Sequence, residues 1–272
     1  MTHPAFRFGP ALLFCPADRP DRYEKAAERA DAVILDLEDA VADADKHSAR
    51  VALVESDLDP ERVIVRVNPA GGPYFADDLA ALGATEYRTV MLAKCEGTAD
   101  LVDLEDYEVL ALCETARGVL AAADVAAIPN VSALMWCAED LVASLGGSSS
   151  RHADGRYRDV ATHARSQVLL AAGAHGVAAI DTVHLEIADV AGLRAEAEDA
   201  AAVGFAATAC IHPSQVPVVR EAYRPDPARL EWARAVLAAA TTEPGVFAFR
   251  GAMVDAPLLR QAEAVVRRAG RG

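Results

Sequence analysis

The sequence predicts a (β/α)8 TIM barrel that carries a C-terminal helical arm. Short apolar runs alternate with longer stretches of helical spacing, and eight such runs can be counted, each followed by a helix or by a gap long enough for one. The length of 272 residues agrees with this, because it matches the size at which a single α/β barrel closes.

The eight expected strands are nearly continuous in Val, Ile, Leu and Ala, as parallel strands covered on both faces are. In chain order they are Ala11–Ala17, Ala32–Asp39, Val63–Pro69, Thr89–Cys95, Glu108–Thr115, Val131–Asp140, Ala178–Leu185 and Ala206–Pro213. The clearest expected helices between them are Pro20–Ala30, Asp45–Leu58, Tyr74–Ala84, Ala116–Ile128, Asp159–Gly176 and Val190–Gly204. An open, doubly wound sheet is the main rival, but no glycine-rich dinucleotide fingerprint follows an early strand.

A long polar loop, Leu145–Tyr157, follows the sixth expected strand and falls outside the eightfold pattern. Two interpretations fit this loop equally. In one, Gly146–Arg151 holds a phosphate group through free amides and the Arg151 guanidinium. In the other, the segment is a flexible polar lid.

The chain after Tyr223 also lies outside the eightfold pattern. Its expected elements are a helix over Ala228–Thr241, an irregular stretch over Glu243–Asp255 and a last helix through Arg268. We therefore predict a barrel over residues 1–223 and a helical extension over residues 224–272. The extension is too short to be a second domain, so we expect it to pack on the barrel or on a neighbouring subunit.

The formal net charge of −15 argues against a nucleic-acid partner, because phosphate backbones are bound by clusters of Lys and Arg. An anionic small ligand remains compatible with this charge, since a local arginine or a bound metal reverses the field inside one cleft. We interpret most of the charge as a solvated acidic surface.

The five cysteines predict neither a disulfide framework nor a zinc knuckle, because they form no Cys-x-x-Cys pair and their number is odd. Cys15, Cys113, Cys137 and Cys210 each stand in an apolar run, where small buried thiols are common. The start at Met1 lacks the long apolar stretch of a signal peptide, and no later run approaches a membrane span. We expect a reduced, cytoplasmic protein that does not contact a membrane.

Charged residues gather where the expected strands end, which in a barrel is the face that carries active groups. These ends read Asp36-Leu-Glu-Asp39, Arg66-Val-Asn68, Lys94-Cys-Glu96, Glu114-Thr-Ala-Arg117, Glu139-Asp140, Asp181 and His212-Pro-Ser-Gln215. Carboxylates that share one opening repel one another unless a cation lies between them. A donor set of oxygens, without grouped cysteines, favours a hard ion such as Mg2+ over zinc.

Glu114 and Asp140 end adjacent strands, and we expect this pair to hold the ion. The alternative is that strand-end carboxylates cap the following helix, an interpretation we prefer for Asp39 and Asp181. Lys94 introduces the alternative of Schiff-base chemistry. Because so many acids surround Lys94, we expect it to pair with a carboxylate instead.

Arg66 stands inside the apolar run of the third expected strand. Two interpretations of its charge remain open, a bidentate clamp on a substrate carboxylate and an internal ion pair with Asp36 or Glu38. For His212 we expect a hydrogen bond with the backbone rather than a role as catalytic base.

Motifs along nearly the whole chain resemble one known family. They are Phe14-Cys-Pro-Ala, Ile34-Leu-Asp-Leu-Glu-Asp-Ala-Val41, Val65-Arg-Val-Asn68, Leu112-Cys-Glu-Thr-Ala-Arg-Gly118, Ala138-Glu-Asp-Leu141, Cys210-Ile-His-Pro-Ser-Gln215 and Gly251-Ala-Met-Val-Asp255. In this order they resemble the citrate lyase β-subunit-like proteins of the HpcH/HpaI aldolase/citrate lyase family, in particular its short, stand-alone members.

The resemblance implies that Glu114 and Asp140 hold Mg2+. It implies further that Arg66 binds a carboxylate of an oxo-acid product, and that the amides around Ala138 and Glu139 hold the same group.

The resemblance also implies a homotrimer, in which the C-terminal arm reaches the active site of a neighbour. Asp255 of that arm would then be the acid–base residue. Asp36 and Glu38 are expected to support catalysis indirectly, by orienting Arg66, a metal-bound water or Lys94.

The predicted activity is a reversible cleavage of a 3-hydroxyacyl-CoA, such as citryl-, citramalyl-, malyl- or hydroxymethylglutaryl-CoA, to a CoA thioester and an oxo acid. Two alternatives stay open. One is a malyl-CoA-type thioesterase or malate synthase-like activity at the same metal site. The other is a citrate lyase subunit that needs a partner.

Overall fold

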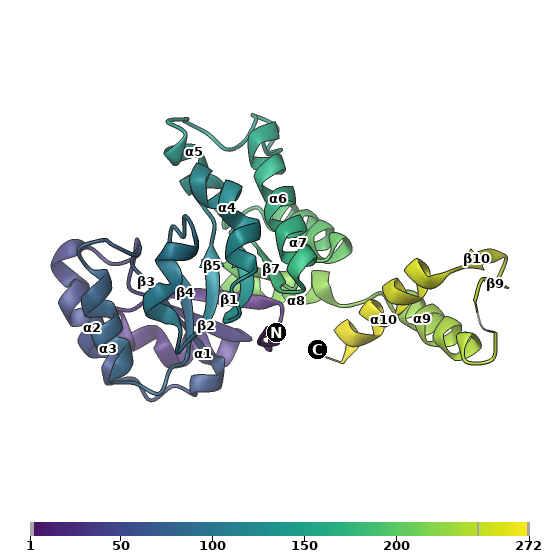
Figure 1. The fold of residues 1–272 in the computed structure, drawn as a ribbon, viewed down its shortest axis with the longest axis horizontal. Coiled ribbons are helices and arrows are strands. Elements are labelled where there is room, and N and C mark those ends of the chain that lie inside the picture. Colours follow the sequence, from purple (N-terminus) through teal and green to yellow (C-terminus); the bar gives the residue numbers. More distant parts are fainter. Residues whose placement is uncertain (1–2, 244, 271–272) are drawn as a thin grey trace. The chain divides into compact units, whose positions relative to one another are not determined.

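The computed structural model of the chain describes residues 3–243 and 245–270 (Figure 1). The chain divides into two compact units, Met1–Val219 and Arg220–Gly272. Met1 and Thr2, on which the prediction of a start without a signal peptide partly rests, lie outside the described residues. Within the described part of the chain, no helix is both long and apolar enough to cross a membrane.

The first unit holds a closed barrel of eight parallel strands whose neighbours follow chain order. The strands are β1 Ala11–Pro16, β2 Ala32–Asp36, β3 Val63–Val67, β4 Thr89–Leu92, β5 Glu108–Leu112, β6 Val131–Met135, β7 Ala178–Asp181 and β8 Ala207–Cys210. Because β1 pairs with β8 as well as with β2, the sheet has no edge. The predicted barrel is confirmed, and the open, doubly wound sheet is excluded.

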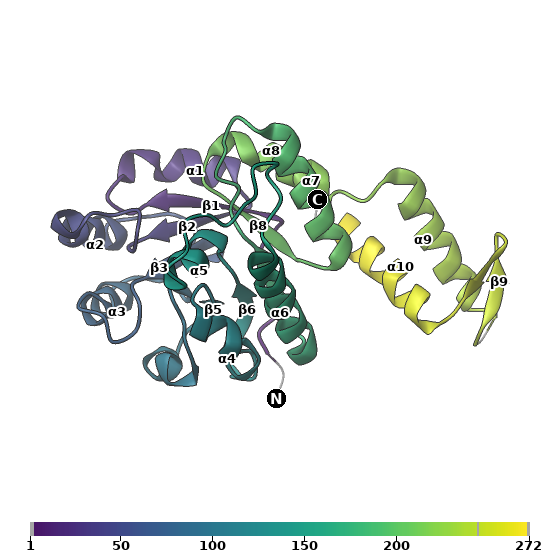
Figure 2. The same cartoon turned by 90° about the horizontal axis from the view of Figure 1, so that it is seen from above.

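Helices surround the strands on the outside (Figure 2). They are η1 Pro20–Arg22, α1 Tyr23–Arg29, η2 Asp43–Asp45, α2 Lys46–Val54, η3 Pro60–Arg62, α3 Phe75–Gly83, η4 Thr98–Leu104, α4 Ala116–Ala126, α5 Ala138–Ser144, α6 Asp159–His175, α7 Val190–Val203, η5 Pro213–Gln215 and α8 Val216–Tyr223. All six predicted helices are present, with ends that differ from the prediction by a few residues.

The sixth strand is shorter than predicted. We expected a strand over Val131–Asp140, but β6 ends at Met135, and Ala138 begins α5. The prediction was wrong because Glu139 and Asp140 stand in the first turn of a helix, where the positive end of the helix dipole favours carboxylates. These two acids therefore extend from a helix N-terminus and not from a strand.

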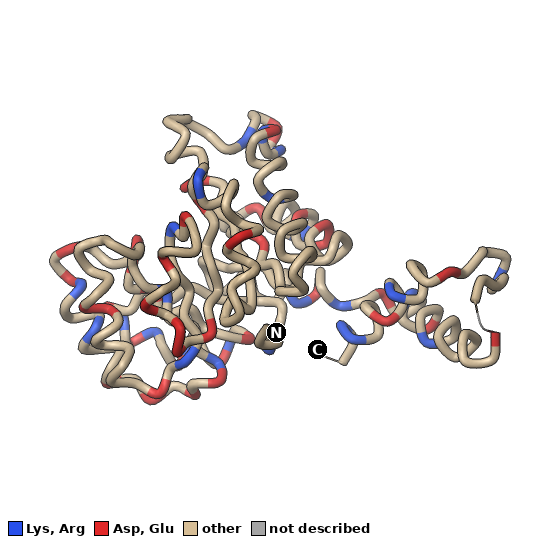
Figure 3. The backbone as a smooth tube through the Cα atoms, viewed as in Figure 1, with Lys and Arg blue, Asp and Glu red and all other residues tan. Residues whose placement is uncertain are grey.

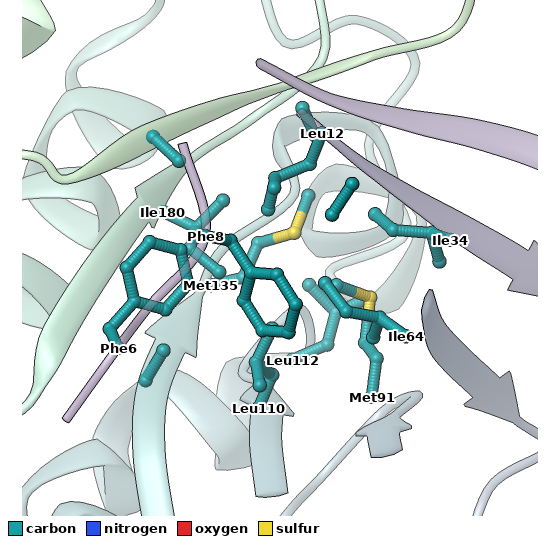
Figure 4. Close-up of a cluster of buried hydrophobic side chains, with 14 residues drawn as sticks. Phe6, Phe8, Leu12, Ile34, Ile64, Met91, Leu110, Leu112, Met135 and Ile180 are labelled. Carbon is teal, nitrogen blue, oxygen red and sulfur yellow. The ribbon is translucent and has the colours of Figure 1, made fainter. Parts of the chain in front are cut away.

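The barrel interior is filled by apolar side chains from all eight strands (Figure 4). Leu12, Ile34 and Ile64 are completely buried there. Phe6 and Phe8, from the segment before β1, pack into the same cluster with their rings 5.5 Å apart in an edge-to-face arrangement. This packing leaves the opposite, C-terminal end of the strands for polar groups.

The second unit contains two helices and a hairpin: α9 Pro227–Ala240, β9 Phe247–Phe249, β10 Ala252–Val254 and α10 Ala256–Ala269. Both helices had been predicted. The stretch Glu243–Asp255 was expected to be irregular, but it contains the hairpin of β9 and β10. Residue 244 of this stretch lies outside the described residues. The hairpin turn has Arg250 and Gly251 at φ of 49° and 84°. Sequence reasoning missed it because its first turn residue is an arginine, where Asn or Asp is usual.

The second unit has a hydrophobic core of its own, formed by side chains from both helices and both strands of the hairpin. Acidic and basic residues are distributed along the helices and loops of both units (Figure 3). This distribution agrees with the interpretation of most of the net charge as a solvated surface.

Candidate active site

The side chains on the inner face of the barrel change from apolar to charged at the C-terminal ends of the strands. Asp36 follows the core residue Ile34 by two positions, and Arg66 follows Ile64 in the same way. Because side chains in a strand alternate between faces, residues two positions apart point to the same side. Glu114, two positions after the end of β5, continues the pattern.

Arg66 forms the internal ion pair that was one of its two predicted roles. Its Nε and Nη2 atoms donate to the Asp36 carboxylate at 2.6 and 2.5 Å, and its Nη1 lies 3.0 Å from a Glu38 oxygen. Burial disfavours the charge of Arg66, but attraction by Asp36 and Glu38 outweighs this and raises its pKa. The two hydrogen bonds to Asp36 engage two of the five N–H donors of the guanidinium, which leaves donors for a substrate carboxylate.

Lys94 pairs with carboxylates, as the surrounding acids had indicated. Its ammonium donates to Glu38 and to Asp39, the latter at 3.0 Å, and lies 3.8 Å from a carboxylate oxygen of Asp140. Burial opposes its charge, but the hydrogen bonds to Glu38 and Asp39 raise its pKa, so Lys94 is a protonated amine and a poor Schiff-base nucleophile.

Lys94 also contacts Glu114 through the main chain. Its backbone N–H donates to Glu114 Oε1 at 3.0 Å, and the residue has a φ of 49°. A left-handed conformation is uncommon for a lysine. The geometry of this turn therefore helps to fix the Glu114 side chain.

Glu114, Cys137 and Asp140 form a group in which one potential ligand atom from each residue lies within 4.8 Å of the others. The Glu114 side chain is buried at 1% exposure, and its Oε2 atom has no hydrogen-bond partner. Burial and the charge of Asp140 raise the pKa of Glu114 to about 8. A divalent cation between Glu114 and Asp140 would satisfy the unpaired oxygen and remove the repulsion, so these residues fit a hard metal ion.

The alternative role of strand-end carboxylates, helix capping, does not describe the acids of this site. The N-cap of α4 is Thr115, whose hydroxyl accepts from the Gly118 amide, and Glu114 points elsewhere. Asp39 pairs with Lys94, so its predicted capping role was wrong.

Asp181 is also not a helix cap, contrary to our prediction. Its buried carboxylate accepts from Trp136 Nε1 at 2.6 Å and from the Arg165 guanidinium at 2.8 Å. The ring directly follows β6 and the guanidinium comes from α6, which are 45 and 16 positions from Asp181, so no local pattern indicated this pairing.

Ala138 and Glu139 are the first two residues of α5, beside the Asp140 ligand position. The Glu139 carboxylate accepts from the hydroxyl of Ser150, in the polar loop after α5. A cavity of about 960 Å3, within the range of ligand pockets, is lined by Glu139 and by residues of this loop and of α7. Its lining residues do not include Glu114, Asp140 or Arg66.

The polar loop is tied down along its length. Arg151 lies with its guanidinium 3.8 Å from the centre of the Tyr157 ring and donates to Gly155 O and to Glu196. These contacts occupy Arg151, which weakens the interpretation of the loop as a phosphate site. They also argue against a freely flexible lid.

Asp255 belongs to the second unit, where it is the N-cap of α10 and accepts from the Leu258 amide at 3.1 Å. Its predicted role in the active site of a neighbouring subunit remains a prediction. His212 accepts from the Ser214 amide at 3.2 Å, and this backbone hydrogen bond is the one we expected.

Sequence reasoning missed Lys46, which supports the loop that carries Asp36 and Glu38. The buried Lys46 ammonium donates to the carbonyls of Leu37 and Glu38 at 2.7 and 2.8 Å and to Asn68 Oδ1 at 3.1 Å. The chain has only three lysines, but no local pattern indicated that Lys46 is buried.

The sequence and the fold of this chain are similar to those of known proteins. The profile of the HpcH/HpaI aldolase/citrate lyase family matches residues 10–213. The crystal structure of a CitE protein from Mycobacterium tuberculosis, in complex with magnesium, acetoacetate and coenzyme A, is 60% identical, with a TM-score of 0.92 over 97% of this chain and 98% of that one.

Two more distant relatives differ in activity. The mitochondrial citramalyl-CoA lyase of Homo sapiens is 31% identical over 94% of this chain and 84% of its own length. A (3S)-malyl-CoA thioesterase of Cereibacter sphaeroides is 35% identical over 88% of this chain and 85% of its own length.

Proposed function

The chain belongs to the HpcH/HpaI aldolase/citrate lyase family, and from this premise we propose that it is a magnesium-dependent carbon–carbon lyase acting on a 3-hydroxyacyl-CoA thioester. One observation carries the proposal: the buried Glu114 carboxylate has an unpaired oxygen, next to Asp140 and at the same strand ends as Arg66. A site built in this way is suited to a divalent cation and a carboxylate at the same time.

Glu114 and Asp140 would hold the magnesium ion. When bound there, the ion supplies a positive charge that orients the substrate's hydroxyl and carboxylate and acidifies the hydroxyl. The remaining steps of the reaction depend on residues of the chain itself.

Arg66 binds the carboxylate that becomes part of the oxo acid, and the amides of Ala138 and Glu139 hold the same group. Asp36 and Glu38 keep the guanidinium in place, since Asp36 accepts two hydrogen bonds from it and Glu38 forms an ion pair with it. A substrate held at two points is oriented for cleavage, which is where such sites obtain much of their rate enhancement.

In the cleavage step the bond between the carbinol carbon and the acyl α-carbon breaks. The hydroxyl releases its proton to solvent and becomes the oxo group, while the bonding electrons pass to the α-carbon as the enolate of the shorter CoA thioester. We assign the protonation of this carbon to Asp255 of a neighbouring subunit in a homotrimer, and the removal of the same proton in the reverse direction.

Thioester hydrolysis is the second candidate, because a relative that is 35% identical is a malyl-CoA thioesterase. The same two carboxylates and ion would then direct a water molecule at the thioester carbonyl. The products separate the two activities, since hydrolysis releases free CoA and leaves the carbon skeleton intact.

The test is product analysis of the purified chain with citryl-, citramalyl-, malyl- and hydroxymethylglutaryl-CoA, each with Mg2+ and with EDTA. We expect a shorter CoA thioester together with an oxo acid, in the presence of Mg2+ only. Free CoA without an oxo acid would replace the lyase by the thioesterase. No reaction with any substrate would contradict both and favour a subunit that requires a partner.

A further inference from the structure

The thiol of Cys137 is the third potential ligand at the carboxylate pair. Its sulfur lies with one oxygen each of Glu114 and Asp140, all three atoms within 4.8 Å of one another. Cys137 follows the core residue Met135 by two positions, so its side chain faces the barrel interior at the level of the site. It is half-buried, whereas Cys15, Cys95, Cys113 and Cys210 are buried.

A second feature indicates that this group binds a ligand. Glu114 Oε2 is buried without a hydrogen-bond partner, and an unpaired carboxylate oxygen is costly unless something occupies the space in front of it. The Asp140 carboxylate and the Cys137 sulfur are the other potential ligands of this group.

Magnesium and the thiophilic divalent ions would use this group differently. Magnesium is a hard ion that binds oxygen ligands and not sulfur, so among these three residues it would be held by the two carboxylates alone. Zinc and cobalt also accept a thiolate, and catalytic zinc sites contain three protein ligands with one position open. Ligand atoms on one such ion lie roughly 3.5 Å apart, from metal distances of about 2.0 Å to oxygen and 2.3 Å to sulfur, so small side-chain rotations would close the group around it.

We propose that Cys137 makes this centre a site for thiophilic divalent cations as well as for magnesium, with Zn2+ held by Glu114, Asp140 and the Cys137 sulfur. Binding of zinc releases the thiol proton to solvent, and no oxidant or reductant is involved. The ion that occupies the site then depends on the available metal, and micromolar zinc competes with magnesium. The inference rests on the metal pair of the proposed function but not on the identity of the reaction.

The experiment measures metal binding to the metal-free protein, without any CoA substrate. Co2+ titration is followed by the near-ultraviolet charge-transfer band that a thiolate ligand produces, and Zn2+ and Mg2+ affinities are measured by calorimetry. The variants are Cys137→Ala and Cys137→Ser, with Cys15→Ala as the matched control, because Cys15 is a buried thiol on β1 outside this group. A thermal melt of each protein verifies folding.

We expect the band in the wild type and in Cys15→Ala and its loss in both Cys137 variants. Zinc affinity should fall by at least about tenfold in these variants, since even residues that only support a metal ligand change affinity by roughly 10- to 100-fold. Magnesium affinity should stay within about twofold of the wild type.

A wild-type cobalt complex without the band, or zinc affinity that is unchanged in Cys137→Ser, would overturn the inference. If Cys137→Ala does not fold, Cys137→Ser decides, because it keeps the size of the side chain and removes the sulfur. Failure of the proposed function gives a different result: zinc and cobalt bind through Cys137, but Mg2+ does not bind and no CoA thioester is cleaved.

Discussion

Replacement of Glu114 by glutamine should stabilise the metal-free protein above neutral pH and abolish magnesium binding. In the wild type this carboxyl has a pKa near 8, compared with 4.5 in an unfolded chain, because it is buried and lies near Asp140. Its folded pKa is the higher one, so the folded state binds more protons between pH 4.5 and pH 8. The free energy of unfolding must therefore fall as pH rises through this window.

The size of the effect follows from the two pKa values. At about 1.4 kcal/mol per pH unit, ionisation of Glu114 in place costs on the order of 5 kcal/mol. A glutamine keeps an oxygen for the Lys94 amide but introduces an NH2 group that has to find a partner, at a cost of about 1–3 kcal/mol. The net gain in stability at pH 8 should be about 2 kcal/mol or more.

The assay is urea denaturation of metal-free wild type and Glu114→Gln at pH 5 and pH 8, each repeated with Mg2+. The variant should gain stability over the wild type as pH rises, whereas Mg2+ should stabilise only the wild type. Glu96→Gln is the control, because Glu96 is a half-exposed carboxylate near the same strand ends. A variant that is less stable than the wild type at both pH values, or one that is still stabilised by Mg2+, would refute the reasoning.

Two further predictions concern residues outside the metal pair. Lys46→Met should lower the free energy of unfolding by about 2–3 kcal/mol in urea denaturation, because it removes the donor to the Leu37 and Glu38 carbonyls. As a control, substitution of the exposed Lys25 by Met should leave the free energy of unfolding within about 0.5 kcal/mol of the wild type. An equal loss of stability in both variants would contradict the role of Lys46 in supporting this loop. Arg66→Met and Asp255→Asn should each reduce kcat/KM by at least about 100-fold. If Asp255 acts in a neighbouring subunit, the two variants should recover part of the activity when they are mixed, unfolded and refolded together. No recovery in mixed oligomers verified by mass spectrometry would place Asp255 in the site of its own chain or outside catalysis.

The barrel and the location of the charged residues could be predicted from the sequence, because both depend on local patterns. Runs of β-branched and aliphatic residues separated by helical spacing identify buried parallel strands, and all eight were found. Parallel strands that close in chain order bring all their C-terminal ends to one face, so Arg66 and Glu114 were expected near one another before any contact was known.

The partners of these residues were decided by the tertiary structure alone. Arg66 could clamp a substrate or pair internally on sequence grounds, and the structure places the carboxylates of Asp36 and Glu38 against it. Asp181 was expected to cap a helix and instead pairs with Arg165, because α6 packs against β7.

Cys137 shows most clearly what could not be predicted from the sequence. Its apolar neighbours in the sequence indicated an inert buried thiol, yet the pairing of β5 with β6 places its sulfur beside Glu114, which is 23 positions earlier in the chain. Local periodicity determines which face of a strand a side chain occupies, and so the sequence by itself determined the barrel and the end that carries the chemistry. The distance between side chains on different strands depends on how the strands tilt and pack around the closed barrel, and this the tertiary structure alone decided.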